Sequence, residues 1–196
     1  MKIIGLAASP RRQGNTEALL DAFLQGAREA GATVEKYALA ELNLRPCDGC
    51  DICSYKSYCP HSDDAMTLLP KLAAADVVVL ATPVYFYGVP AQAKALIDRA
   101  QYLWAQRHVL HRKVGKPGGR GVLLAVGGSR GKKLFDGISL TVRYFMDTLG
   151  KDLASSLLLR GVDEIDALRQ DTRALARAQR LGAKIAAGQS GRAKRR

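Results

Sequence analysis

Short apolar runs alternate along the chain with longer stretches in which apolar residues recur every three or four positions. The runs at residues 2–8, 76–81 and 121–126 are continuous and rich in branched side chains. Such runs are typical of parallel strands that are covered on both faces. Residues 33–39 and 154–159 also have the composition of strands. The pattern therefore predicts five strands.

The stretches between these strands have helical periodicity. Gly31 stands where a C-terminal helix cap belongs, and Ser62 or Asp63 is suited to cap a helix that follows it. The predicted helices cover residues 15–30, 66–75, 91–104, 135–149 and 163–187. Regular alternation of strand and helix predicts an α/β fold with a doubly wound parallel sheet. We expect one domain over residues 1–188 and a basic, disordered tail at 189–196.

In doubly wound sheets the ligands bind at the carboxyl ends of the strands, near the point where the strand order reverses. Three loops follow the first, third and fourth predicted strands, and they should meet at that edge. They comprise residues 9–16, 82–90 and 127–133. We therefore expect the binding chemistry of the domain to lie in these loops.

The first of these loops has the groups needed to bind a compact anion. Ser9 and Thr16 supply hydroxyls, Arg11 supplies a positive charge, Asn15 supplies an amide, and a predicted helix begins here with free N–H groups. This combination favours a terminal monophosphate. The sequence has neither the Gly-Lys-Ser/Thr of a Walker loop nor a G-x-G-x-x-G fingerprint. An ordinary helix-capping turn remains an alternative for this loop alone.

The other two loops are suited to a flat ligand. Three consecutive aromatic residues at 85–87 follow directly after a buried strand, where neither a core nor a solvated turn needs three rings. Residues 127–131 read Gly-Gly-Ser-Arg-Gly, and glycine lets the main chain approach a ligand closely. A monophosphate together with a planar heterocycle indicates flavin mononucleotide (FMN).

The same motifs resemble a known family. The chain contains Ser-Pro-Arg at 9–11 with Gly-Asn-Thr at 14–16, Thr-Pro-Val-Tyr-Phe at 82–86 with Val-Pro-Ala-Gln at 89–92, and Gly-Gly-Ser at 127–129. This pattern is similar to the NADPH-dependent FMN reductase family, and with the cysteines it resembles the iron–sulfur flavoprotein branch. The resemblance covers residues 1 to about 159. It implies a flavodoxin-like sheet with strand order 2-1-3-4-5 and a cysteine-rich loop after the second strand.

The resemblance also implies roles for individual residues. The residues expected to hold the phosphate are Ser9, Arg11, Asn15 and Thr16. Those expected to line the isoalloxazine ring are Pro83, Val84, Tyr85 and Phe86. Those expected to close over its edge are Gly127, Gly128 and Ser129. No catalytic side chain is assigned, because hydride transfer requires no protein acid or base.

All four cysteines of the chain lie within thirteen positions. Cys47, Cys50, Cys53 and Cys59 have the spacing C-x2-C-x2-C-x5-C, and Pro60 follows the last of them. Thiolates three residues apart suit the successive irons of a cubane, and the run resembles a ferredoxin motif. We expect a [4Fe–4S] cluster here. Zinc, which prefers two knuckles set further apart, and metal-free thiols remain alternatives.

Composition and charge argue against a membrane protein, a secreted protein and a nucleic-acid-binding protein. The chain of 196 residues carries a formal net charge of +12, and residues 105–133 contain eight Lys or Arg and no acidic residue. We expect this basic surface to attract phosphorylated cofactors rather than nucleic acid, because no nucleic-acid-binding motif accompanies it. The first apolar run is too short for a signal peptide, and no run is long enough to cross a bilayer. We therefore expect a cytoplasmic protein without membrane contact, in a compartment where disulfides are rare.

Together these features predict an FMN-dependent oxidoreductase that transfers electrons. The donor would be NAD(P)H or ferredoxin and the acceptor a small molecule, and the resemblance implies a homodimer or homotetramer. A cluster-free NAD(P)H-dependent FMN or quinone reductase is the first alternative. The second is a non-enzymatic redox-sensing protein whose cysteine loop or basic face binds a partner.

Overall fold

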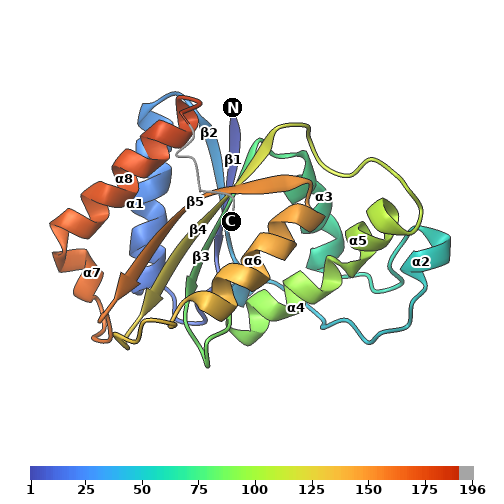
Figure 1. Ribbon diagram of the computed structural model, residues 1–196, viewed down its shortest axis with the longest axis horizontal. Helices are drawn as coiled ribbons and strands as arrows, with labels where there is room; N and C mark the ends of the chain where they lie inside the picture. The colour runs from blue at the N-terminus through green and yellow to red at the C-terminus, as the bar shows by residue number, and fades with distance from the viewer. Residues whose placement is uncertain (190–196) are drawn as a thin grey trace.

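The computed structural model describes residues 1–189 and contains a parallel sheet of five strands in the order β2-β1-β3-β4-β5. Figure 1 shows the strands fanning through the centre of the molecule with helices on both sides. The strands are β1 (Lys2–Ala7), β2 (Thr33–Ala38), β3 (Val77–Pro83), β4 (Gly119–Gly127) and β5 (Lys151–Arg160). The predicted flavodoxin-like topology is confirmed. The predicted basic tail lies mostly outside the described residues.

Helices connect and cover these strands. They are α1 (Asn15–Glu29), the 3-10 helix η1 (Leu39–Glu41), α2 (Cys53–Lys56), α3 (Asp64–Ala74), α4 (Ala91–Arg99), α5 (Gln101–His108), α6 (Asp136–Thr148), α7 (Ala167–Gln170) and α8 (Thr172–Ala186). Asp63 caps α3, and its side chain accepts a hydrogen bond from the main-chain N–H of Ala65 at 3.1 Å. None of the helices in the described part of the chain is long and apolar enough to span a membrane.

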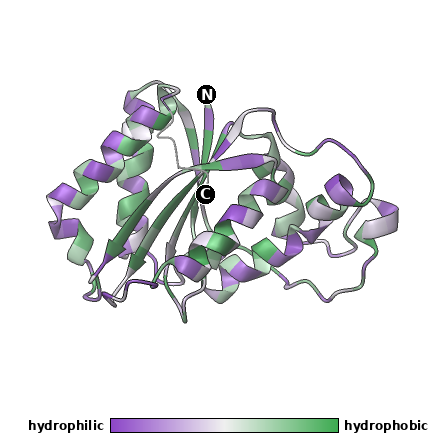
Figure 2. Cartoon of the chain, in the orientation of Figure 1, coloured by the Kyte–Doolittle hydropathy of each residue, from purple (hydrophilic) through white to green (hydrophobic). Residues whose placement is uncertain are grey.

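Successive residues of the central strands bury their side chains in opposite layers, because side chains alternate across a strand. Val77 and Val79 pack in a core under α1, α7 and α8, whereas Val78 and Leu80 pack under α3, α4, α5 and α6. The hydropathy colouring in Figure 2 follows this arrangement, with apolar strands enclosed between helices that are polar on their outer faces. A continuous apolar strand is therefore required in the middle of the sheet.

Two predicted helices are interrupted in the structure. The helix predicted at residues 91–104 is divided at Ala100, whose N–H is shared between the carbonyls of Leu96 and Ile97 at 3.1 Å each. This sharing tightens the last turn of α4 before α5 begins. The helix predicted at residues 163–187 was wrong over its first part, where only the short α7 forms. Asp171 accepts hydrogen bonds from two N–H groups of the following turn and so starts α8 anew.

The helices α1 and α8 lie against one another with their main chains in contact. A Cβ atom added at Gly182 would lie 1.9 Å from the carbonyl oxygen of Phe23, and one at Gly26 would lie 2.0 Å from that of Gln179. No other residue type fits at these two positions without a shift of the main chain. The α1 side of the sheet is therefore closed tightly.

Candidate functional site

The loops after β1, β3 and β4 meet at the carboxyl edge of the sheet, where the strand arrows end in Figure 1. The N–H of Ala8 donates to the carbonyl of Ala81 at 2.8 Å, and the N–H of Val84 donates to that of Val126 at 2.9 Å. These hydrogen bonds continue the sheet pairing into the loops. The predicted phosphate, ring and edge segments are thus brought to one side of the domain.

In the first loop, the hydroxyl-bearing residues Ser9 and Thr16 are buried, whereas Arg11 is exposed. Ser9 Oγ accepts the N–H of Arg11 at 3.1 Å and so shapes the turn. Gly14 precedes α1 and provides no side-chain cap. The helix therefore begins with main-chain N–H groups directed at the loop, an arrangement that favours an anion.

Glu17 organises this loop from within α1. Its carboxylate accepts the N–H of Gln13 at 2.7 Å, Arg12 Nη2 at 2.9 Å and Lys36 Nζ at 2.9 Å. The hydrogen bond from Arg12 is the largest cause that lowers the pKa of Glu17, which falls to about 2 despite burial. The carboxylate is thus ionised, and the positive charges of Arg12 and Lys36 offset its negative charge. It can therefore hold the loop without repelling an anion placed beside it.

The side chain of Asn15 forms two hydrogen bonds that its sequence position does not indicate. Its side-chain amide donates to the carbonyl of Glu164 at 2.7 Å and its Oδ1 accepts the N–H of Leu168 at 2.9 Å. The segment after β5 is also joined to the third loop, since the N–H of Val162 donates to the carbonyl of Gly127 at 3.2 Å. This fourth segment, residues 161–166, therefore belongs to the edge and was not foreseen.

The aromatic residues of the second loop form a tight reverse turn. Tyr85 and Gly88 exchange main-chain hydrogen bonds of 3.0 and 2.8 Å, and the two residues between them have positive φ, 49° at Phe86 and 60° at Tyr87. Bulky residues rarely adopt this conformation, and such strain gathers at functional sites. All three rings are exposed, and Phe86 is fully so. The rings are therefore free of the core and available to a ligand.

The glycines of the third loop allow close packing around this turn. A Cβ atom at Gly127 would lie 2.9 Å from the Leu134 side chain and 3.3 Å from that of Val84, and one at Gly128 would lie 2.7 Å from Asp163 Oδ1. Ser129 Oγ accepts the N–H of Gly131 at 3.2 Å. A larger residue at either position would displace one of these side chains.

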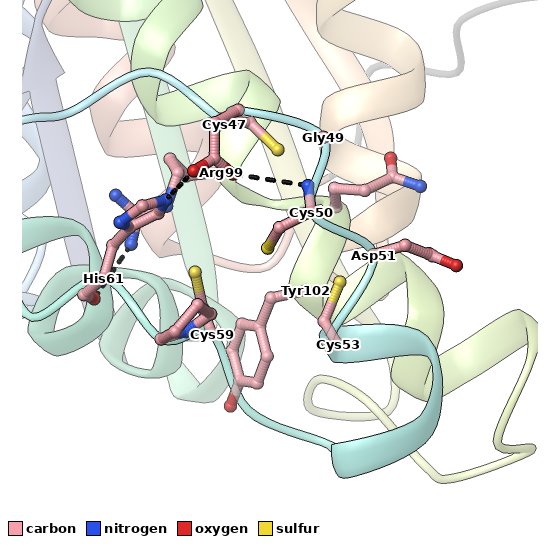
Figure 3. A pocket seen from close by; sticks show the side chains of 12 residues that line it. Cys47, Gly49, Cys50, Asp51, Cys53, Cys59, His61, Arg99 and Tyr102 are labelled. Atoms are coloured by element: carbon pink, nitrogen blue, oxygen red, sulfur yellow. Dashed lines mark hydrogen bonds and ion pairs between the residues drawn. The ribbon is translucent and has the colours of Figure 1, made fainter.

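The cysteine loop lies on the other side of the domain from α1 and α8, beyond α4 and α5. Figure 3 shows the sulfur atoms of all four cysteines turned toward a common space. That space is a cavity of about 270 Å³ whose lining includes every cysteine of the chain together with Arg99 and Tyr102. All four cysteines are free thiols. Burial raises the pKa of the Cys53 thiol.

The thiols surround the cavity without converging on one point. Within residues 1–189, no three side chains of His, Cys, Asp or Glu are placed to hold a single metal ion. Thiolates are ligands both for zinc and for the irons of an iron–sulfur cluster, and all four thiols line this one cavity.

Residues 1–135 match the family model of the NADPH-dependent FMN reductases. The chain belongs to this family. Curated relatives include the iron–sulfur flavoproteins of Methanocaldococcus jannaschii, 44% identical over 103 residues, and of Methanosarcina thermophila, 37% identical over 130 residues. These alignments cover 53% and 66% of this chain and 53% and 65% of the relatives. The chain thus spans about half to two thirds of the length of the curated relatives it matches.

Solved structures show the same fold as this family member. An NAD(P)H:quinone oxidoreductase from Methanothermobacter marburgensis is 22% identical with a TM-score of 0.72, covering 94% of this chain and 96% of that one. A flavone reductase is 20% identical with a TM-score of 0.71, covering 96% of this chain and 63% of that one. At this level of identity the likeness concerns the fold.

Two residues of this FMN reductase family member were missed by sequence reasoning. Glu17 follows Gly14 by three positions, which is the spacing of a capping box. This spacing could have predicted that the Glu17 carboxylate turns back to the loop before α1. Arg99 lies three residues after Leu96 and four before Leu103, both of which are buried. Arg99 is therefore a charged residue on an apolar helix face, and this position could have predicted that it is buried and paired.

Proposed function

We propose that this protein is an FMN-dependent oxidoreductase that takes electrons from NAD(P)H or ferredoxin and carries a [4Fe–4S] cluster on its four cysteines. The observation that carries the cluster assignment is the single cavity lined by Cys47, Cys50, Cys53 and Cys59. Soft thiolates select iron–sulfur clusters or zinc. The iron–sulfur flavoproteins among the relatives support the cluster.

The family and the loop geometry support FMN at the carboxyl edge of the sheet. The hydroxyls of Ser9 and Thr16, the guanidinium of Arg11 and the first N–H groups of α1 would hold the phosphate. Asn15 would contribute through its main-chain N–H, because its side chain is already bonded to residues 164 and 168.

The ring would lie against the aromatic turn. The residues proposed to line it are Pro83, Val84, Tyr85 and Phe86, and those proposed to close over its edge are Gly127, Gly128 and Ser129. The positive φ values of the turn fix where its main-chain groups point, so that these groups are positioned before the ring arrives.

When bound, FMN accepts a hydride and releases single electrons, and an iron–sulfur cluster carries one electron at a time. The chain itself binds and orients these groups, and its net charge of +12 attracts a phosphorylated donor. A small-molecule acceptor, assembly as a homodimer or homotetramer, and a place in the cytoplasm belong to the same proposal.

The test is anaerobic purification followed by assays of FMN, iron and acid-labile sulfide. We expect one FMN and about four irons and four sulfides per chain. In Cys50→Ser the harder oxygen ligand should remove most of the iron while FMN remains, because the two sites lie on separate loops. Ser62→Ala, an exposed change beside the cysteine loop, is the matched control and should keep both groups.

Other metal contents would redirect the proposal. One zinc without sulfide would indicate a structural zinc site. No metal after anaerobic reconstitution with iron and sulfide would leave a cluster-free FMN or quinone reductase. Loss of FMN from wild-type protein under all conditions would contradict the flavin assignment and favour a redox-sensing binding protein.

A further inference from the structure

The cysteine loop is closed at its base by one guanidinium group. Nη1 of Arg99 donates to the carbonyl of Arg45 at 3.1 Å, and Nη2 donates to the carbonyl of His61 at 3.2 Å. Arg45 stands two residues before Cys47, and His61 stands two residues after Cys59. A single side chain from α4 therefore holds both ends of the segment that carries all four thiols.

Asp63 completes this contact. Its Oδ2 accepts Nη1 of Arg99 at 2.5 Å and the N–H of Arg45 at 2.9 Å, while its Oδ1 caps α3. Both side chains of the Arg99–Asp63 pair are fully buried. Buried ions are retained only when their geometry and hydrogen bonding compensate for lost hydration. Here the hydrogen bonds of both side chains go to the two ends of the cysteine loop.

We propose that Arg99 and Asp63 form a clasp that closes the cysteine loop and holds its four thiols in a cluster-binding arrangement before the metal arrives. The proposal rests on the proposed [4Fe–4S] function. Its physical basis is preorganisation, because a loop whose ends are already fixed loses less conformational entropy when its ligands bind.

A second observation connects Arg99 with the contents of the cavity. Arg99 lines the cavity with the cysteines, and its Nε is buried without a hydrogen-bond partner among the residues that the structure describes. The Arg99 side chain is fully buried, so it lies behind the wall of this cavity rather than in it. Loss of Arg99 should therefore loosen that wall and open a bound cluster to a chelator.

The variants are chosen to distinguish an effect on the cysteine loop from a general loss of protein stability. Removing Arg99 alone would leave Asp63 charged and buried, so the main variant is Asp63→Asn with Arg99→Met, in which both charges are removed and the α3 cap is kept. Arg99→Lys keeps the charge but loses the fork that reaches two carbonyls. Arg107→Met is the matched control, because Arg107 pairs with Asp147 outside the cysteine cavity.

The readouts are FMN content and the rate at which an iron chelator removes the cluster under anaerobic conditions. The double variant should keep FMN and lose its cluster about tenfold faster, as expected for a change next to metal ligands. Arg99→Lys should also lose its cluster faster than the wild type. Arg107→Met should match the wild type.

An unchanged rate of cluster loss in the double variant would overturn the clasp. If that variant fails to fold, as judged by circular dichroism and FMN content, Arg99→Lys decides the question in the same way. Wild-type protein without iron and sulfide after reconstitution would overturn the proposed function instead, which distinguishes the two failures.

Discussion

The two helical layers of the protein differ in how closely they pack. On one side α1 and α8 bring their main chains into contact at Gly26 and Gly182. On the other side α4, α5 and α6 border cavities of about 270 and 670 Å³, and a buried ion pair joins Arg99 to Asp63. Close packing stabilises the fold, whereas the looser layer leaves room for thiols, charges and ligands.

The difference should appear most strongly when a methyl group is added to a glycine in each layer. In Gly182→Ala the new Cβ atom meets the carbonyl oxygen of Phe23, which cannot move without shifting α1. We expect a loss of about 3 kcal/mol in the free energy of unfolding, despite the higher helix propensity of alanine. Urea denaturation followed by circular dichroism measures it.

Gly121→Ala is the counterpart in the looser layer. Its Cβ atom would lie 2.6 Å from the Met146 side chain, which is flexible and can change rotamer. We expect a loss of only about 1 kcal/mol, and the exposed Lys184→Ala on α8 should change stability by less than about 0.5 kcal/mol. Equal losses in Gly182→Ala and Gly121→Ala would remove the distinction between the layers.

The tight layer also ends in the proposed phosphate loop, which a conservative pair of variants can probe. Thr16→Val removes a hydroxyl at constant volume from a residue that is only 4% exposed. A hydrogen bond to a charged group contributes about 1.5–3 kcal/mol, so the Kd for FMN should rise about tenfold or more. Quenching of FMN fluorescence measures it. Thr16→Ser should retain wild-type affinity, and unchanged binding in Thr16→Val would place the phosphate elsewhere.

Glu17 makes the stability of this loop depend on pH. The pKa of Glu17 is lowered to about 2, so its contribution is present above pH 4.5 and is lost as the pH falls from 4.5 toward 2. We expect Glu17→Gln to cost the FMN-free protein about 2 kcal/mol at pH 7 and less than half of that near pH 3. Urea denaturation across this range measures the difference.

Asp21→Asn provides the control for Glu17, because Asp21 is exposed and bonds to the same Lys36. It should change stability by less than about 1 kcal/mol at any pH in the range, as exposed pairs do. A loss for Glu17→Gln that stays constant between pH 7 and pH 3 would contradict the role given to the charged carboxylate.

The smallest effect is expected at the aromatic turn, on the looser side. Phe86→Gly should raise the stability of the FMN-free protein by about 0.5–1 kcal/mol, because glycine adopts positive φ without strain. Phe86→Ala, which removes the ring but keeps the strain, should not. Both should weaken FMN binding. Thermal unfolding of the two variants measures the difference, and equal midpoints would show that the turn is not strained.

Much of the fold could be predicted because its signals are local. Continuous branched runs such as residues 77–81 must be covered on both faces, which predicts central parallel strands. The divisions at Ala100 and Asp171 could not be predicted from apolar periodicity, since the apolar stripe continues through both positions.

The candidate site likewise has parts that could be predicted from local sequence and parts that could not. The spacing of the cysteines is a sequence property, and the structure places all four around one cavity. The contacts of Asn15 with residues 164 and 168, and of Arg99 with Arg45 and His61, join positions far apart in the chain. Their partners depend on the tertiary fold, and no local pattern specifies them.

The contact between α1 and α8 has a consequence for how the chain is made. α1 is complete once the first 29 residues have been synthesised, but its glycine-lined face fits a helix that begins at Thr172. During translation that face is not covered by α8 until more than 140 further residues have been synthesised after α1. Contacts of such large sequence separation slow folding and leave intermediates prone to aggregation. The same close fit that stabilises the folded protein therefore leaves an apolar helix face uncovered while the chain is being made.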